Sequence, residues 1–236
     1  MKKFTITPIS VVNVNRPKIP KRTNKLSDNQ SSRQGFSSFP MEIGTLCANF
    51  FLEHSTMVFD PFAGWGERHK CCENEGLNYT GFDISPDAID YAKKTFNVTN
   101  TLANSLVDEI PPHDALLTCP PYGSLEKYEG EGNISKCKNY DIFLSNYKKI
   151  LSRATKKALP NSTYCIMVGD WRSKGIYYNF SLDTENIMNE LGFKTADKII
   201  VNQTKTANWR VMMVNAKRFK YTAKVHQYLL VFKNHL

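Results

Sequence analysis

From residue 40 onward, short apolar segments alternate with longer segments whose apolar positions recur at helical spacing. Residues 40–54 place apolar side chains at 43, 46, 47, 50 and 51, which predicts an amphipathic helix. Further helices are predicted up to residue 74, from Ser85 onward, over 139–159 and over 181–191. Strands are predicted over 57–60, 78–83, 99–103, 114–118, 163–168, 193–201 and 223–232.

Strands that alternate with helices predict a parallel sheet covered by helices on both faces. Seven strands fit the pattern, so we expect a seven-stranded, mostly parallel, Rossmann-like α/β sheet. No helix is predicted between the last two strands, which should pair as an antiparallel C-terminal hairpin around a basic segment, 202–222. Ligands of such sheets bind at the carboxyl ends of strands, and here Asp60, Asp83 and Thr118 occupy those ends.

The chain has 236 residues, which suits one domain. Residues 1–33 are polar, basic and rich in Pro, Asn and Ser, which predicts a flexible arm with at most one short strand near 6–14. Residues 34–236 form the predicted domain, with a long polar loop over 123–138. No segment approaches the ~18 apolar residues of a membrane span, and no signal peptide is recognisable.

Six cysteines occur, at 47, 71, 72, 119, 137 and 165. None forms a C-x-x-C pair, and none clusters with histidine at zinc spacing. These observations argue against a disulfide scaffold, a zinc finger and a metal site. We therefore expect a cytoplasmic globular protein with reduced thiols.

The formal net charge of +9 is concentrated at the two ends of the chain. Residues 1–35 carry eight basic residues against one acidic residue, and residues 194–236 carry nine against one. The middle, 36–193, has 14 basic and 20 acidic residues. Basic ends around an acidic middle favour a polyanionic partner gripped by the flanks, although surface lysines also serve solubility alone.

The first candidate site is Asp60-Pro61-Phe62-Ala63-Gly64-Trp65-Gly66, between a predicted strand and a helix. Gly64 and Gly66 permit a tight turn and a close approach of backbone to ligand. The following helix N-terminus can donate N–H groups to a carboxylate, and Asp60 can hold an ammonium group. The alternative is a turn that needs glycine only for its geometry.

The second candidate site is Asp83, about 20 residues after the first. A carboxylate at the end of the second strand of a βαβ unit can accept both hydroxyl groups of a ribose. Taken together, the two sites favour a nucleoside cofactor. The P-loop lysine and the G-x-G-x-x-G pattern are absent, so ATP and NAD fit less well.

The third candidate site is Thr118-Cys119-Pro120-Pro121-Tyr122, after a buried strand. The two prolines stiffen the turn and leave carbonyl groups as acceptors, while Tyr122 offers an aromatic face to a planar base. The alternative is a strand end beside a core tyrosine. Basic and aromatic residues are interleaved elsewhere, which suits phosphate contacts and base stacking, or a solvated hairpin. The candidates for nucleic-acid contact are Arg172, Trp209, Arg210, Lys217, Arg218 and Lys220.

Together these motifs resemble the S-adenosylmethionine-dependent amino-group DNA methyltransferases, which methylate adenine-N6 or cytosine-N4. DPFAGWG is similar to the D-P-F-x-G-x-G cofactor loop of that family, and TCPPY to its (D/N/S)-P-P-Y catalytic motif. The resemblance covers about residues 35–236. It implies S-adenosylmethionine as cofactor, and the cofactor-binding residues that it implies are Phe39, Pro40, Asp60, Phe62, Gly64, Gly66, Asp83, Ile84 and Ser105.

The resemblance also implies direct methyl transfer to a flipped-out base. The amino group would donate to the Pro120 carbonyl and to the side chain at position 119, Pro121 would shape the turn, and Tyr122 would stack on the base. The sequence departs from the family at Cys119, where Asp, Asn or Ser is usual, and at Ser105, where an acid is usual. A thiol is closest in size to serine, which favours cytosine-N4 slightly.

Several alternatives stay open. Cys119 could act as a nucleophile in pyrimidine C5 chemistry, but the Pro-Cys-Gln loop of that family is absent. The chain could methylate RNA, or bind nucleic acid without catalysis. We expect DNA rather than RNA as partner, within restriction and modification, with a specificity subunit or a second copy as a further partner. No separate target-recognition domain is recognisable in the sequence.

Overall fold

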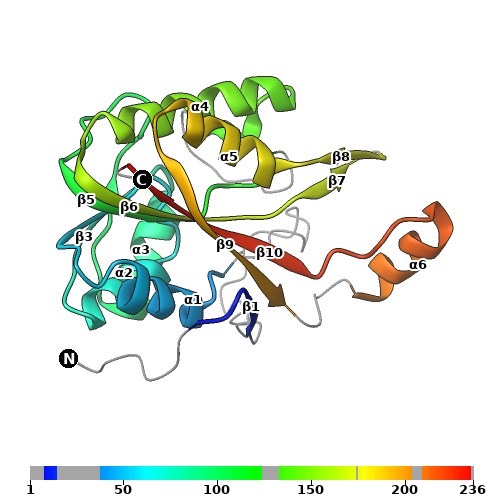
Figure 1. Ribbon diagram of the computed structural model, residues 1–236, viewed down its shortest axis with the longest axis horizontal. Helices are drawn as coiled ribbons and strands as arrows, with labels where there is room; N and C mark the ends of the chain where they lie inside the picture. The colour runs from blue at the N-terminus through cyan, green and yellow to red at the C-terminus, as the bar shows by residue number, and fades with distance from the viewer. Residues whose placement is uncertain (1–7, 15–37, 124–132, 174, 204–208, 235–236) are drawn as a thin grey trace.

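A computed structural model describes residues 8–14, 38–123, 133–173, 175–203 and 209–234. Its main sheet has eight strands among these residues, in the order β1-β9-β10-β6-β5-β2-β3-β4 (Figure 1). The strands are β1 (Val11–Val14), β2 (Met57–Asp60), β3 (Asn78–Asp83), β4 (Thr101–Leu102), β5 (His113–Thr118), β6 (Ala158–Val168), β9 (Lys194–Gln203) and β10 (His226–Lys233).

The sheet is mostly parallel. β2 pairs in parallel with β3 and β5, and parallel pairing continues to β4 on one side and β6 on the other. β10 is antiparallel to both β6 and β9. The predicted parallel sheet and the antiparallel pairing of the last two long strands are therefore confirmed.

The sheet has one strand more than the seven expected. The additional strand is β1, which pairs in parallel with the edge strand β9, Val11 lying opposite Ile200. Val14 at its end is 3% exposed, so this strand adds to the core. Four residues within a polar, basic segment give too weak a pattern to count as a strand, and pairing with the open edge of β9 and burial of Val14 stabilise it. The division into an arm and a domain stays a prediction.

Helices cover both faces of the sheet (Figure 1). On one face lie α1 (Met41–Leu46), its π-helical continuation η1 (Cys47–Phe51), α2 (Glu67–Asn74) and α3 (Pro86–Phe96). On the other face lie α4 (Tyr140–Thr155) and α5 (Phe180–Glu190), and a 3₁₀ turn, η3 (Ile134–Lys136), precedes α4. The helix predicted over 139–159 ends earlier, because the residues from Ala158 onward extend β6.

Local signals place the ends of two helices. The Ser85 hydroxyl accepts the N–H of Ala88 at 3.4 Å, and Pro86 occupies the first position of α3, which confirms the predicted N-terminus. The Asn139 side chain accepts the N–H of Ile142 at 2.9 Å and begins α4 in the same way. These caps need only neighbouring residues, so the sequence predicts them well.

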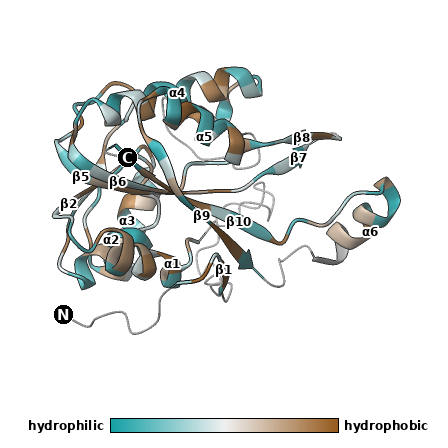
Figure 2. Cartoon of the chain, in the orientation of Figure 1, coloured by the Kyte–Doolittle hydropathy of each residue, from teal (hydrophilic) through white to brown (hydrophobic). Residues whose placement is uncertain are grey.

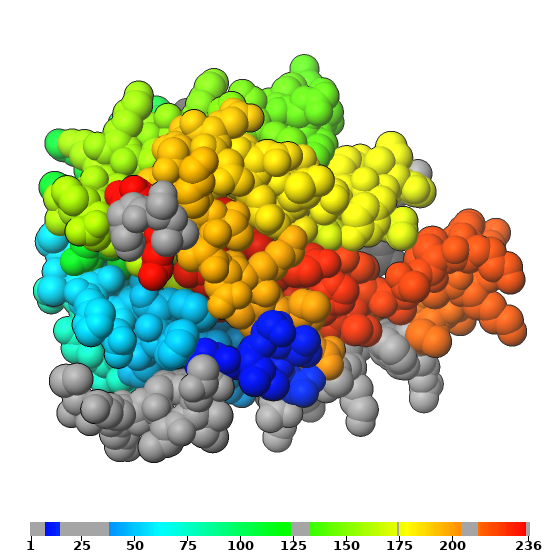
Figure 3. All heavy atoms as spheres, viewed as in Figure 1, coloured from blue at the N-terminus to red at the C-terminus, as the bar shows by residue number. Residues whose placement is uncertain are grey.

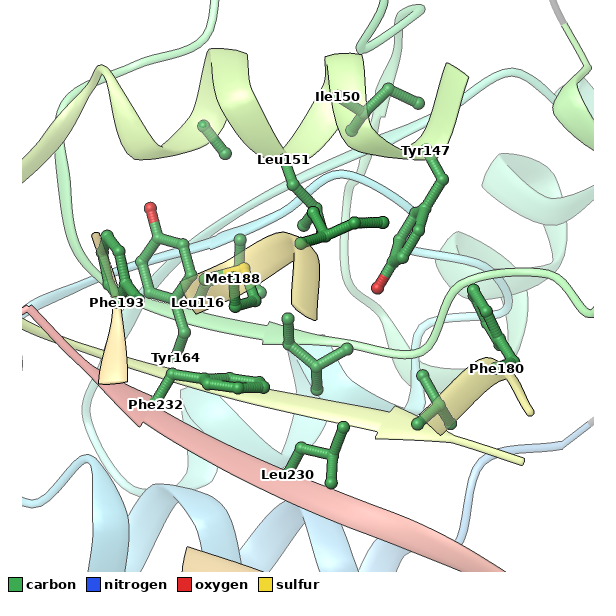
Figure 4. Close-up of a cluster of buried hydrophobic side chains, with 14 of the residues drawn as sticks. Leu116, Tyr147, Ile150, Leu151, Tyr164, Phe180, Met188, Phe193, Leu230 and Phe232 are labelled. Carbon is green, nitrogen blue, oxygen red and sulfur yellow. The ribbon is translucent and has the colours of Figure 1, made fainter. Parts of the chain in front are cut away.

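Two clusters of buried side chains lie on the two faces of the sheet. Figure 4 shows one of them, in which Tyr147 and Leu151 of α4 and Phe180 of α5 point toward the sheet residues Leu116 and Leu230. Figure 2 shows that hydrophobic residues run along the central strands between the two helix layers. No described helix is long and apolar enough to cross a membrane.

Two elements differ from the prediction. A helix, α6 (Trp209–Phe219), lies between β9 and β10, where the sequence suggested only a basic segment. A two-stranded hairpin of β7 (Trp171–Ser173) and β8 (Ile176–Tyr178) follows β6 and was not predicted. Both extend from the same end of the molecule, beyond its main body (Figure 3). The strands of the hairpin have only three residues each, and most described residues of α6 are exposed, so neither shows the long apolar pattern of a core element.

Gly66 is essential to the packing of α2 against α3. Its φ is +100°, and an added Cβ would lie 2.7 Å from the Cβ of Ala92. We expect Gly66→Ala to lower the free energy of unfolding by about 2–4 kcal/mol, from backbone strain and overpacking together. Gly76→Ala is the matched control, because Gly76 has a φ of +78° and open space around it. Equal losses in urea unfolding would contradict the predicted clash.

Candidate functional site

The carboxylate of Asp60, at the carboxyl end of β2, accepts four hydrogen bonds. Its Oδ1 accepts the N–H of Phe62 at 2.9 Å and the hydroxyl of Thr118 at 2.5 Å. Its Oδ2 accepts the Nε of Arg68 and the hydroxyl of Tyr79, both at 2.6 Å. The Asp60 side chain is fully buried, and these donors come from β2's own turn, β5, α2 and β3.

Arg68 is the charge partner of Asp60. Burial would by itself lower the pKa of Arg68, but the charge of Asp60, its hydrogen bond to Arg68 and smaller contributions from Tyr79 and Cys119 together outweigh burial and raise it. The guanidinium also donates to the carbonyl of Phe62 at 2.5 Å and lies 4.9 Å from the ring centre of Phe39. A buried ion pair thus joins the turn after β2 to the segment that precedes α1. The sequence analysis missed Arg68 and Tyr79, because only the fold brings them to Asp60.

A carboxylate has about four acceptor positions, and the four donors fill those of Asp60. Asp60 therefore stabilises the 60–66 turn through hydrogen bonds within the protein. Direct contact between Asp60 and the ammonium group of a ligand stays a prediction. The filled acceptor positions of Asp60 argue against such a contact.

Asp83, at the end of β3, lies against the same turn. Its Oδ2 accepts the N–H of Gly64 at 2.7 Å, and its Oδ1 accepts the N–H of Ser85 at 2.9 Å. Burial raises the pKa of Asp83, although both N–H groups favour the carboxylate form. Each oxygen has one further acceptor position in this arrangement, so Asp83 can still receive hydroxyl donors. The structure thus brings the first two candidate sites together.

Ser105 also contacts the 60–66 turn. Its hydroxyl donates to the carbonyl of Pro61 at 2.9 Å, and it is buried. The predicted role of Ser105 in cofactor binding stays a prediction. Phe62 and Ile84 are half-buried at the same edge of the sheet.

The segment before α1 is fastened to the start of α2. The Ser38 hydroxyl donates to Glu67 at 3.1 Å, and Phe39 and Pro40 are buried beside it. Burial raises the pKa of Glu67, while the neighbouring Arg68 charge and the Ser38 and Phe39 donors partly offset the effect. Arg68 thus links Phe39 to the carbonyl of Phe62 in the 60–66 turn. Cofactor contacts of Phe39 and Pro40 stay a prediction, and Glu67 is a further residue that was not predicted from the sequence.

The turn after β5 has its aromatic residue held by hydrogen bonds. The Tyr122 hydroxyl lies 3.7 Å from the Cys119 sulfur and accepts the Nε2 of Gln227 at 2.6 Å. Gln227 in turn accepts the side chain of Gln203 at 3.0 Å. Cys119, Pro121 and Tyr122 are half-buried, and Pro120 is buried. Strand β10 thus sets the position of Tyr122, which no local sequence signal predicts.

Aromatic side chains surround Tyr122. Its ring centre lies 6.2 Å from that of Trp171 in the β7–β8 hairpin and 6.5 Å from that of Phe180. An added Cβ at Gly123 would lie 2.9 Å from the Trp171 ring, and the φ of Gly123 is +49°. The hairpin therefore packs directly against the third candidate site.

The predicted nucleic-acid contacts divide into two groups. Arg172 is in the hairpin, and Lys217, Arg218 and Lys220 are exposed in or directly after α6. The side chains of Trp209 and Arg210 lie outside what the structure describes. The hairpin and α6 lie at the same end of the molecule (Figure 3). Within the described part of the chain, no cluster of three or more His, Cys, Asp or Glu residues could hold a metal ion.

No family model and no curated protein match the chain. Solved structures do match. N-methyltransferase NodS from Bradyrhizobium japonicum, with S-adenosylhomocysteine, is 9% identical with a TM-score of 0.55, over 83% of this chain and 86% of that one. The chain has a methyltransferase fold.

Two further structures agree with this methyltransferase fold. The 1,6-didemethyltoxoflavin-N1-methyltransferase from Burkholderia thailandensis is 14% identical with a TM-score of 0.52, over 82% of this chain and 77% of that one. Magnesium protoporphyrin IX methyltransferase from Synechocystis is 10% identical with a TM-score of 0.52, over 82% and 78%. The predicted Rossmann-like fold class is thereby confirmed.

The Asp60–Arg68 ion pair should be strongly coupled. Asp60→Asn leaves a buried guanidinium without its carboxylate, and we expect the free energy of unfolding to fall by about 3–5 kcal/mol. Arg68→Met leaves the Asp60 charge unpaired and should cost a similar amount. The double variant should lose clearly less than the sum of the two, because it leaves no unpaired charge. Urea unfolding of the four proteins measures the coupling, and additive losses would show that the pair does not act as a unit.

Proposed function

We propose that the protein transfers a methyl group from S-adenosylmethionine to the exocyclic amino group of a flipped-out DNA base, cytosine-N4 or adenine-N6. One observation carries the proposal. The hydrogen bond from Thr118 to Asp60 joins the TCPPY turn to the DPFAGWG turn, so the two motifs lie at one edge of the sheet. The methyltransferase fold supports methyl transfer in general, and the two motifs support a base amino group as the acceptor.

Residues around the 60–66 turn fit the proposed cofactor. Asp83 retains acceptor positions for the two hydroxyl groups of a ribose, and Gly64 and Gly66 allow the positive φ values of the turn. The ring of Phe39 lies 4.9 Å from the guanidinium of Arg68, which donates to the Phe62 carbonyl of the turn. S-adenosylmethionine, when bound, supplies an electrophilic methyl group on a sulfonium centre, so the protein needs to contribute chiefly position and orientation.

Residues of the TCPPY turn fit the proposed substrate. A base amino group would donate to the Pro120 carbonyl, which directs its lone pair out of the ring. Tyr122 would stack on the base, and its hydrogen bond from Gln227 holds the ring in a defined orientation. Alignment of the reacting groups can contribute about 7–11 kcal/mol to lowering the barrier.

Cys119 occupies the position of a second acceptor. A thiol is a weak acceptor, so Pro120 would be the main partner of the amino group. The two alternatives make different predictions for this residue: in direct transfer the Cys119 side chain only accepts a hydrogen bond, whereas in ring-carbon methylation its sulfur forms a covalent bond to the base.

The proposed cofactor site can be tested by binding. Asp83→Ala removes two charge-assisted acceptors of ribose hydroxyls, each worth about 1.5–3 kcal/mol, and should weaken binding of S-adenosylhomocysteine in calorimetry at least tenfold. Asp87→Ala is the matched control, because Asp87 is an exposed carboxylate four residues away in the first turn of α3. An Asp83→Ala dissociation constant equal to that of the control would refute the ribose assignment.

The proposed transfer can be tested with labelled S-adenosylmethionine, a DNA or an RNA substrate, and mass spectrometry of the nucleosides. Cys119→Ser should keep activity or raise it, because serine has a similar shape and is a better acceptor. Tyr122→Ala should lower activity through the loss of stacking, worth about 1–3 kcal/mol.

Three results would contradict this proposal or part of it. A folded, cofactor-binding Cys119→Ser protein without activity would indicate a covalent route, with the product on a ring carbon. Methylated RNA without methylated DNA would identify RNA as the substrate. Cofactor binding with no transfer to either nucleic acid would indicate a protein that has lost catalysis.

A further inference from the structure

Arg172 contacts two tyrosine rings that come from different elements. Its guanidinium carbon is 4.6 Å from the ring centre of Tyr177 in β8 and 4.8 Å from that of Tyr221, just after α6. These contacts connect the β7–β8 hairpin to the α6 segment, the two parts that extend from the body of the molecule (Figure 1). We call Tyr177, Arg172 and Tyr221 the arginine clamp.

The charge of Arg172 is not balanced within the described structure. No described carboxylate lies within ion-pair distance of it, and its Nε is buried without a hydrogen-bond partner among the described residues. The neighbouring cation differs: Lys224 lies 3.3 Å from Asp170 and donates to the Tyr177 hydroxyl at 2.9 Å. Asp170 thus neutralises Lys224, and Arg172 is left as the cation without an anion.

The surroundings of Asp170 strengthen this contrast. Burial opposes its ionisation, but donors from Ser181 and Tyr177 and the charge of Lys224 outweigh burial and lower its pKa. Asp170 is therefore an ionised carboxylate with three partners of its own. Asp170 forms its hydrogen bonds and ion pair with these groups and not with Arg172.

The arginine clamp suits a phosphodiester anion. Two aromatic rings in contact with a guanidinium restrict its orientation, and its planar N–H groups match two oxygens of a phosphate. The hairpin that carries the clamp also packs on the proposed base site: the ring centre of Trp171 is 6.2 Å from that of Tyr122. Arg172 follows Trp171 in β7, so its side chain projects from the opposite face of the hairpin. A phosphate next to a flipped-out nucleotide would lie within reach of such a position.

We propose that the arginine clamp binds a backbone phosphate of the nucleic acid next to the target base. This inference rests on the proposed function only in taking the substrate to be a nucleic acid. Its test therefore measures binding, and transfer is measured separately.

The test uses fluorescence anisotropy of the full chain with a short labelled DNA duplex and, in a second arm, a single-stranded RNA of the same sequence. Arg172→Gln should weaken binding about tenfold, the size of a lost charge-assisted contact. It should also reduce the slope of log affinity against log salt by about 0.9 for the duplex. Lys149→Gln is the control, because it removes the same charge from an exposed position on α4.

Arg172→Lys separates the charge from the clamp geometry. It should keep the salt slope of the unchanged protein while binding several-fold more weakly, because lysine lacks the planar fork. Calorimetry with S-adenosylhomocysteine shows whether each variant retains its fold.

The proposal is overturned if Arg172→Gln and Lys149→Gln bind both nucleic acids equally well, or if the unchanged protein binds neither. It is supported by a selective loss on DNA, on RNA or on both, and the affected arm identifies the source of the phosphate. A selective loss in a protein that transfers no methyl group would support the clamp and refute the proposed function.

Discussion

The buried ion pair between Asp60 and Arg68 is the interaction on which the candidate site depends. A buried charge without a partner is strongly destabilising, so the two groups must meet in the folded chain. Meeting requires α2 to begin directly after the glycine turn, and it brings Tyr79 of β3 and Thr118 of β5 to the same carboxylate. One desolvated acid therefore aligns three neighbouring strands and the turns that follow two of them.

The order of the strands places the turn after β2 and the turn after β5 on either side of a reversal in the sheet. β3 and β4 lie on one side of β2, whereas β5 and β6 lie on the other, so the chain reverses direction across the sheet between β2 and β5. The turn after β2 leads to α2, and the segment after β5 leads to α4 in the opposite layer (Figure 1). Ligands of open α/β sheets bind at such a reversal. The proposed cofactor residues and substrate residues flank it.

Local signals were enough to predict much of this arrangement. Pro61, the glycines of the turn and the Ser85 cap act through their nearest neighbours, so the strand ends and the α3 boundary follow from the sequence. Arg68, Tyr79 and Gln227 could not be assigned in this way, because their partners are fixed only when strands pair. β1 was expected as at most a short strand outside the seven-stranded sheet, and the β7–β8 hairpin was not predicted. The reason is related: each strand is three or four residues long and is stabilised by its partner strand.

The electrostatics of the ion pair also give a physical reason for a neutral side chain at position 119. An ionised group there would interact with the charge of Arg68, so Cys119 lies within the field of the same buried pair. Arg68 is already matched by Asp60, whose acceptor positions are filled. A carboxylate at this half-buried position would add a second negative charge beside a cation that Asp60 already pairs. The thiol avoids that cost, and the Pro120 carbonyl and the stacking ring of Tyr122 then become the main means of orienting an amino group.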